Sequence, residues 1–123
     1  DDLDGDGHPD LVAAIFVPGN RLSVFLNDGQ GGFPVRTDIG TAGIPTAVAT
    51  GDLDGDGDVD LAFTVRSFID HHIGVLLNDG NGGFPGAVTQ YPIGSVGSMP
   101  NDGAGGSSGQ PTPTRWVNYR PRW

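Results

Sequence analysis

The sequence predicts an all-β fold made of repeated four-stranded antiparallel units. All fifteen acidic residues are Asp and all six basic residues are Arg, so the Glu and Lys residues that helix surfaces usually carry are absent. The 22 Gly and 10 Pro residues favour short strands joined by tight turns. A pattern of apolar segments and turns recurs after about 50 residues, which indicates that one structural unit is repeated.

The most prominent repeated segment is a nine-residue acidic loop followed by Leu. Residues 2–11 read Asp-Leu-Asp-Gly-Asp-Gly-His-Pro-Asp-Leu, and residues 52–61 read Asp-Leu-Asp-Gly-Asp-Gly-Asp-Val-Asp-Leu. The carboxylates at positions 1, 3, 5 and 9 can converge only if the loop folds back on itself, which the glycines at positions 4 and 6 permit. These carboxylates belong to Asp2, Asp4, Asp6 and Asp10 in the first loop and to Asp52, Asp54, Asp56 and Asp60 in the second.

Converging carboxylates need a counter-ion, and a hard divalent cation that takes about six to eight oxygen ligands suits them. We expect one Ca²⁺ in each loop, two in total, with the backbone carbonyl of position 7, His8 or Asp58, as a further ligand. Mg²⁺ demands tighter octahedral geometry, and soft metals prefer Cys or His. The alternative is an acidic surface turn without an ion, because Asp and Gly are also common in turns.

Both loops begin like an EF-hand loop, but the rest of that motif is missing. An EF-hand needs a bidentate Glu at position 12, where this chain has Ala13 and Phe63. Each loop is followed by an apolar, partly β-branched run, at 11–17 and 61–65, instead of an amphipathic helix. These runs predict strands that are covered on both faces.

The remaining elements follow in the same order in both copies: a turn, a third strand, an Asn-Asp-Gly turn and a half-exposed edge strand. They lie at 18–20, 22–26, 27–34 and from 33 in the first copy, and at 66–72, 73–77, 78–85 and from 84 in the second. A connector at 40–45 and a strand of small residues at 46–50 lead into the second acidic loop. This short strand is expected to be the innermost strand of its unit.

A four-stranded sheet whose inner strands are apolar on both faces must pack against further sheets, as the blades of a propeller do. The sequence therefore predicts an incomplete β-propeller with about two blades. The first blade, residues 1–44, lacks its inner strand, and the second blade spans residues 45–100. Residues 101–123 are rich in Gly, Ser and Pro without alternation, and we expect them to be disordered.

With these loops and turns, the chain resembles the FG-GAP or VCBS-type repeats of calcium-binding β-propellers. The resemblance covers about residues 1–100 and includes the Leu-Asn-Asp-Gly-x-Gly-Gly-Phe turns at 26–33 and 77–84. It implies that each acidic loop joins the innermost strand to the second strand and holds one Ca²⁺. The Phe-Gly and Gly-Ala-Pro elements of integrin α-subunits are missing, so the chain is more similar to bacterial secreted members, and integrin ligand binding is not implied.

These features predict a calcium-binding structural or interaction segment of a larger secreted or cell-surface propeller protein that serves adhesion or ligand binding, not an enzyme. The expected partners are a protein or glycan ligand and the neighbouring blades that complete the fold. One alternative is a lectin-like propeller that uses Tyr91, in which case Tyr91→Ala should abolish glycan binding. Another alternative is the accessory propeller of an extracellular enzyme.

Other classes of function lack the residues that they need. Residues 1–100 contain three Arg and no Lys, so they form no basic stripe for nucleic acid. No apolar run reaches the roughly 18 residues that a membrane span needs. The chain begins inside an acidic loop without a signal segment, which suggests a fragment of a larger protein. We expect the Asp70-His71-His72 segment to be a solvated turn.

Overall fold

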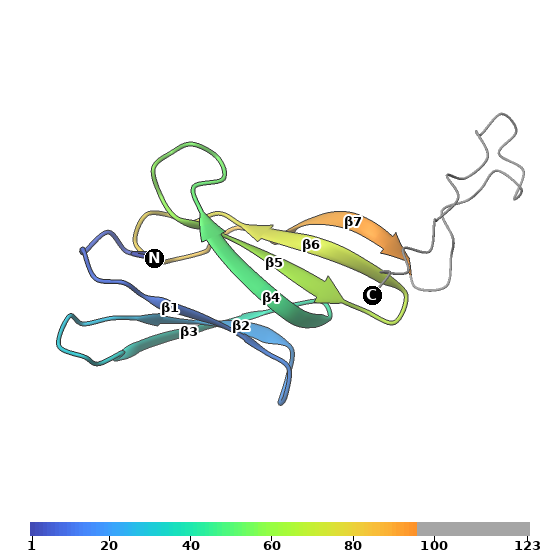
Figure 1. Ribbon diagram of the computed structural model, residues 1–123, viewed down its shortest axis with the longest axis horizontal. Coiled ribbons are helices and arrows are strands. Elements are labelled where there is room, and N and C mark those ends of the chain that lie inside the picture. Colours follow the sequence, from blue (N-terminus) through green and yellow to red (C-terminus); the bar gives the residue numbers. More distant parts are fainter. Residues whose placement is uncertain (96–123) are drawn as a thin grey trace, which may run out of the picture.

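The computed structural model describes residues 1–95 and contains seven strands in two antiparallel sheets (Figure 1). No helix occurs among these residues, so the predicted all-β fold of incomplete propeller blades is confirmed. The first sheet has the order β1 (Leu11–Ile15), β2 (Arg21–Leu26) and β3 (Val35–Gly40). The second has the order β4 (Ile44–Gly51), β5 (Asp60–Arg66), β6 (Asp70–Leu76) and β7 (Thr89–Ser95).

Both sheets are simple meanders in which each strand pairs with the next one along the chain. β1 pairs with β2 from Leu11↔Phe25, and β5 pairs with β6 from Leu61↔Leu76. The second acidic loop connects β4 to β5, and the first acidic loop directly precedes β1. The two repeats therefore place their acidic loops at equivalent positions.

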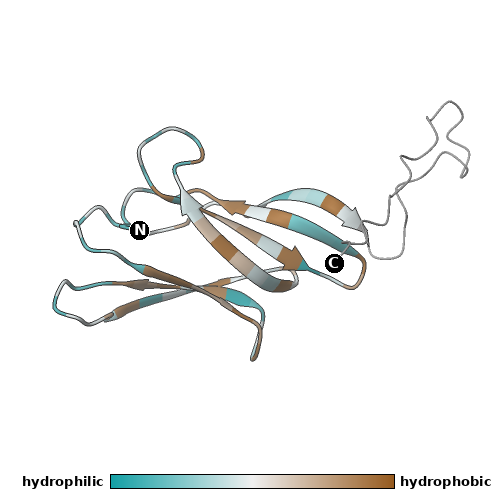
Figure 2. Cartoon of the chain, in the orientation of Figure 1, coloured by the Kyte–Doolittle hydropathy of each residue, from teal (hydrophilic) through white to brown (hydrophobic). Residues whose placement is uncertain are grey.

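The hydrophobic core lies between the two sheets and contains residues from both of them. Buried and less buried residues alternate along most of β5 and β6, and Figure 2 shows hydrophobic residues on the strands of both sheets. Branched and aromatic side chains fill the space: the buried members are Leu3, Leu22, Val24, Leu61, Phe63, Val65 and Leu76. Leu3 comes from the first acidic loop, so this loop takes part in the packing of the sheets.

The two strands that follow the acidic loops differ in burial, although their sequences are alike. Leu61 at the start of β5 is fully buried, whereas Leu11 at the start of β1 is 53% exposed. β5 lies between β4 and β6, but β1 has β2 as its only neighbour in the described sheet. The prediction that residues 11–17 form a strand covered on both faces is therefore wrong, because β1 ends at Ile15 and none of its residues is buried.

The predicted connector at 66–72 is shorter in the structure. β5 continues to Arg66 and β6 already begins at Asp70, with the backbone N–H of Ser67 donating to the Asp70 carbonyl at 3.1 Å. The prediction of a solvated turn at Asp70-His71-His72 is wrong, because strand alternation buries His72 to 6% exposure while Asp70 stays exposed.

The other edge of the first sheet, β3, is more exposed than the expected half-exposed strand. All residues of β3 are exposed except the half-buried Ile39. The predicted disorder of residues 101–123 concerns a segment outside the described residues. Within residues 1–95, no helix is long and apolar enough to cross a membrane.

Candidate metal centre

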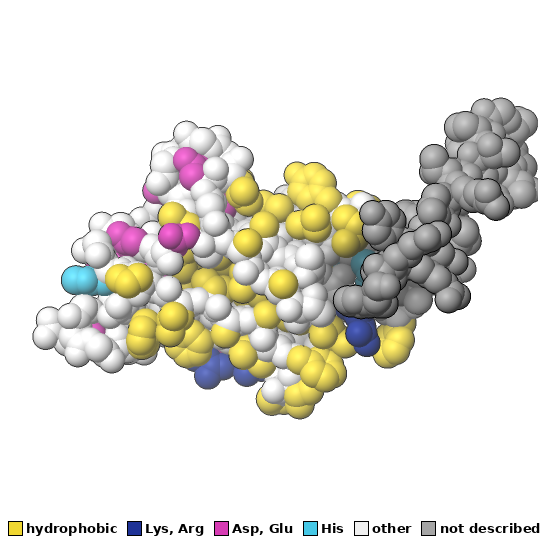
Figure 3. Space-filling model, in the orientation of Figure 1, with side chains coloured by type: hydrophobic (Ala, Val, Ile, Leu, Met, Phe, Trp, Pro, Cys, Tyr) yellow, Lys and Arg dark blue, Asp and Glu magenta, His cyan; other side chains and the backbone are white. Residues whose placement is uncertain are grey.

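The two acidic loops lie at the same end of the molecule as the Asn-Asp-Gly turns. Figure 1 shows the loop before β1, the loop between β4 and β5, and the turns after β2 and β6 together at this end. In the space-filling view of Figure 3, acidic side chains gather over these loops. The end of the sheets therefore carries most of the negative charge of the protein.

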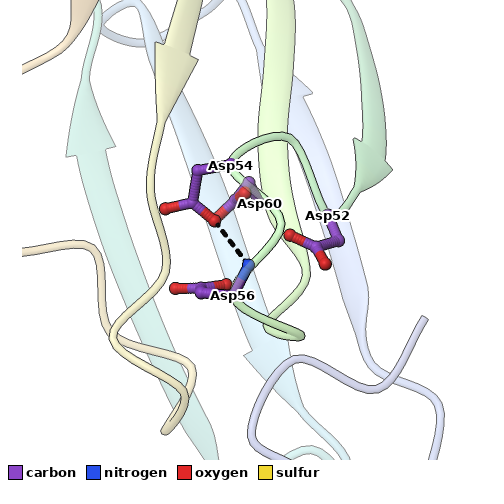
Figure 4. Close-up of side chains that lie close together, drawn as sticks. All are labelled: Asp52, Asp54, Asp56 and Asp60. Atoms are coloured by element: carbon purple, nitrogen blue, oxygen red, sulfur yellow. Dashed lines mark hydrogen bonds between the residues drawn. The ribbon is translucent and has the colours of Figure 1, made fainter.

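The second loop brings four carboxylates together, as Figure 4 shows. One oxygen from each of these side chains lies within 4.8 Å of the corresponding oxygens of the others. Three of the side chains are exposed and the fourth is buried; they belong to Asp52, Asp54, Asp56 and Asp60. The loop thus collects the residues of positions 1, 3, 5 and 9 around one point.

Backbone hydrogen bonds to position 1 hold each loop in its folded-back shape. Asp52 accepts from the N–H groups of Gly55 at 2.8 Å and of Gly57 at 2.9 Å. Asp2 accepts in the same way from Gly5 and Gly7, both at 2.8 Å. The two glycines of each loop have positive φ, between 78° and 95°, which side chains other than Gly rarely tolerate.

Position 9 is the buried anchor of each loop. Asp60 is fully buried and Asp10 is 6% exposed. The carboxylate of Asp60 accepts from the N–H groups of Leu53 and Asn78, both at 2.8 Å. Asp10 accepts from Leu3 at 2.6 Å and from Asn27 at 2.8 Å, so each anchor ties its loop to the following Asn-Asp-Gly turn.

The first loop is less complete than the second. Its cluster contains Asp2, Asp4 and Asp10, whose oxygens again lie within 4.8 Å of one another. Asp6 lies outside this cluster and accepts from the backbone N–H of His8 at 2.8 Å. The structure therefore brings together three of the four predicted side chains here and all four in the second loop.

The side chains at position 7 point to the neighbouring turn instead of the clusters. A Cβ added at Gly29 would overlap the His8 imidazole, and one added at Gly80 would lie 2.8 Å from an oxygen of Asp58. Both glycines have positive φ and belong to the Asn-Asp-Gly turns. The side chain of His8 or Asp58 thus packs on the turn of its own repeat.

Desolvation and the crowding of like charges raise the pKa of two carboxyl groups in the loops. Desolvation, together with repulsion from Asp6 and Asp10, raises the pKa of Asp4. Desolvation and then repulsion from Asp56 and Asp60 raise the pKa of Asp58. In contrast, the hydrogen bond from the Gly7 backbone is the main cause that lowers the pKa of Asp2.

The sequence reading treated Asn27 and Asn78 as turn residues and missed their contacts with the loops. The Nδ2 group of Asn78 donates to the carbonyls of Val59 at 2.8 Å and Leu3 at 2.7 Å. The Nδ2 group of Asn27 donates to the Pro9 carbonyl at 2.8 Å. The recurrence of Asn shortly after the second strand that follows each loop, β2 and β6, was the available signal.

The chemistry of the donor atoms fits a calcium ion. Oxygens that bind one Ca²⁺ at about 2.3–2.6 Å can be at most about 5 Å apart, and the clustered carboxylate oxygens meet this limit. All clustered donors are hard oxygens, and no Cys or His side chain is among them. The second loop offers the more complete set.

Comparison with known proteins supports the same family as the loops. A family model described as an FG-GAP-like repeat matches residues 2–63, which is 62 of the 123 residues and includes both acidic loops. No curated protein and no solved structure gives a significant match. The match confirms the FG-GAP resemblance that the loops and turns carry, and the chain belongs to the FG-GAP-like repeat family.

Proposed function

We propose that this chain is a calcium-stabilised repeat segment of a larger extracellular or cell-surface β-propeller that serves adhesion or ligand binding. The observation that carries this proposal is the convergence of four carboxylates in the second loop within 4.8 Å. The role of calcium is structural, and the segment itself is not catalytic. Protein or glycan ligands are partners of the whole propeller.

The stabilising effect follows from the charge of the loops. Ten of the fifteen Asp residues lie in residues 1–10 and 52–60, so the carboxylates within each loop repel one another when no cation is bound. Asp52, Asp54, Asp56 and Asp60 would hold one ion in the second loop, and Asp2, Asp4 and Asp10 would hold one in the first. A bound divalent cation neutralises this repulsion and joins the strands on either side of the second loop.

Neighbouring blades are part of the proposal. The open edge of β1 and the 53% exposure of Leu11 support it, because the equivalent residue Leu61 is fully buried by the strands around it. An added blade strand beside β1 would complete the first sheet in the way that β4 completes the second.

Thermal melting of the 123-residue chain in calcium and in EDTA tests the calcium role. With a dissociation constant of about 10⁻⁴–10⁻³ M, roughly 10 mM Ca²⁺ should add about 1–3 kcal/mol per bound ion and raise the melting midpoint by several degrees. The control is Asp52→Asn/Asp54→Asn, which should lose most of the second loop's share. An unchanged midpoint in calcium would reject the proposal.

A further inference from the structure

We propose that Asn78 couples the two acidic loops, so that a cation bound at one loop strengthens binding at the other. This inference rests on the proposed function, because it concerns the same two sites. The carrying observation is a continuous line of hydrogen bonds that joins the buried anchor carboxylate of the first loop to that of the second.

The line runs through one residue of the first loop, Leu3, and one residue of the second repeat, Asn78. The Leu3 backbone N–H donates to Asp10 Oδ2 at 2.6 Å, and the Leu3 carbonyl accepts from Asn78 Nδ2 at 2.7 Å. The Asn78 backbone N–H donates in turn to Asp60 Oδ1 at 2.8 Å. Two residues, Leu3 and Asn78, thus connect the two position-9 anchors without a gap.

All members of this line are shielded from solvent. Leu3 is 2% exposed, Asn78 and Asp10 are each 6% exposed, and Asp60 is fully buried. Water cannot replace these hydrogen bonds at such positions, and a buried polar group left without a partner costs about 1–3 kcal/mol. The geometry of one anchor therefore constrains that of the other.

The Asn78 amide has no freedom to rearrange without breaking bonds. Its two N–H donors serve the carbonyls of Leu3 and Val59, and its Oδ1 accepts from the N–H groups of Gly80 at 3.0 Å and Gly82 at 3.2 Å. A primary amide has two donors and one acceptor oxygen, so both donors and the oxygen are engaged. Asn78 therefore acts as a rigid link between the loops.

The coupling follows from the cost of ordering the loops. A cation at the first loop fixes Asp10 and, through it, the backbone of Leu3, whose carbonyl accepts from Asn78. Asn78 and Asp60 are then already ordered when the second cation binds, so its binding costs less conformational entropy of the second loop. Thermodynamic linkage makes the effect reciprocal.

Asn27 provides a matched control inside the same chain. It occupies the equivalent turn position, donates from Nδ2 to the Pro9 carbonyl at 2.8 Å, and donates from its backbone N–H to Asp10 at 2.8 Å. Its Oδ1 accepts from Gly29 at 2.9 Å. These bonds match those of Asn78 to its own repeat except for the one from Gly82, and within residues 1–95 Asn27 has no bond to the other repeat.

Calorimetric Ca²⁺ titration of the full chain tests the coupling. Calcium affinity of the second loop is compared between the wild type and Asp2→Asn/Asp4→Asn, in which the first loop is disabled. We expect the disabled loop to weaken the second site about fivefold or more, which corresponds to a coupling free energy of about 1 kcal/mol. In an Asn78→Ala background this ratio should fall to about one, whereas in an Asn27→Ala background it should persist.

Because Asn78→Ala also removes the acceptor for Gly80 and Gly82, Asn78→Asp serves as a second variant that keeps this acceptor and the backbone donor. Asn27→Asp adds the same charge in the first repeat and controls for it. Independent sites in the wild type, or a ratio that survives both Asn78 variants, would overturn the coupling while leaving calcium binding intact. Absence of any calcium binding would instead overturn the proposed function, and the coupling with it.

Discussion

Leu3 and Leu53 occupy the same position in the two acidic loops but have different surroundings. Leu3 is 2% exposed and belongs to the core between the sheets, whereas Leu53 is 52% exposed. The loop sequences around them are nearly identical, so the difference comes from the neighbouring repeat that covers Leu3. The same residue type thus serves as core in one repeat and as surface in the other.

Replacing each leucine by Ala should therefore give unequal effects. Leu3→Ala removes a buried side chain and should lower the free energy of unfolding by about 2–5 kcal/mol. Leu53→Ala should change it by less than about 0.5 kcal/mol, because exposed substitutions rarely matter more. Chemical denaturation of both variants measures their free energies of unfolding. Equal losses of stability would show that Leu3 does not contribute to the packing between the sheets.

For single residues, the sequence predicted the carboxylates of the ion site but not the contact between the two sheets. The four carboxylate positions could be predicted because their spacing and the adjacent glycines are local features, although Asp6 lies outside its cluster. The contact between Leu3 and Asn78 spans 75 positions and depends on how the sheets pack, so no local pattern reveals it.

The central pair of strands in the second sheet is held by an aromatic residue opposite a glycine. Phe63 of β5 and Gly74 of β6 are partners in the strand register. A Cβ added at Gly74 would lie 2.7 Å from Cε2 of the Phe63 ring. The ring therefore packs directly on the glycine backbone, and the pair leaves no room for a side chain at position 74.

Gly74→Ala should destabilise the sheet by about 1–3 kcal/mol through overpacking. The matched control is Gly40→Ala at the end of β3, where an added Cβ meets nothing within 4 Å and φ is not positive. That variant should melt close to the wild type. Circular dichroism melts decide the matter, and a tolerated Gly74→Ala would mean that Phe63 can move away at little cost.

The strands themselves were largely predictable, while their burial and some boundaries were not. Alternation and turn residues indicated all seven strands of the described chain, including the exposed β3, although β7 begins at Thr89 and not at 84 as expected. The absence of an inner strand from the first blade already placed β1 at an edge, but the apolar run at 11–17 was still expected to be covered on both faces, because burial depends on what lies beside a strand. The start of β6 at Asp70 was missed since polar residues there resemble a turn.

The whole molecule carries a formal net charge of −9 that is concentrated at one end. Both acidic loops lie there, and no Lys occurs anywhere in the chain to offset them (Figure 3). The raised pKa values of Asp4 and Asp58 show that the fold holds some carboxylates against repulsion and desolvation. A net charge of this size opposes folding through repulsion between like charges.

This charge predicts a pH effect in calcium-free buffer. A carboxyl whose pKa is raised by folding favours the fold at low pH, and this contribution is lost as the pH rises through the raised pKa. At pH 7, Asp4→Asn/Asp58→Asn should therefore melt above the wild type, and the difference should shrink as the pH falls through the raised pKa values towards the usual Asp pKa of about 3.9.

The histidines are common to both proteins, so they largely cancel in this difference. Asp2, whose pKa is lowered, withdraws its stabilisation only when the pH falls through that lowered value. A double variant that melts below the wild type at pH 7 would contradict the expected repulsion.

The contact between Leu3 and Asn78 uses different groups from the two repeats, so the interface between repeats has a direction along the chain. One repeat contributes a loop leucine and its carbonyl, and the next contributes an amide, so the two surfaces of the interface are different. An interface between two different surfaces is heterologous, and a series of such interfaces repeats the same rotation from unit to unit. Whether such a series closes into a ring or continues as a helix depends only on how that rotation divides a full circle.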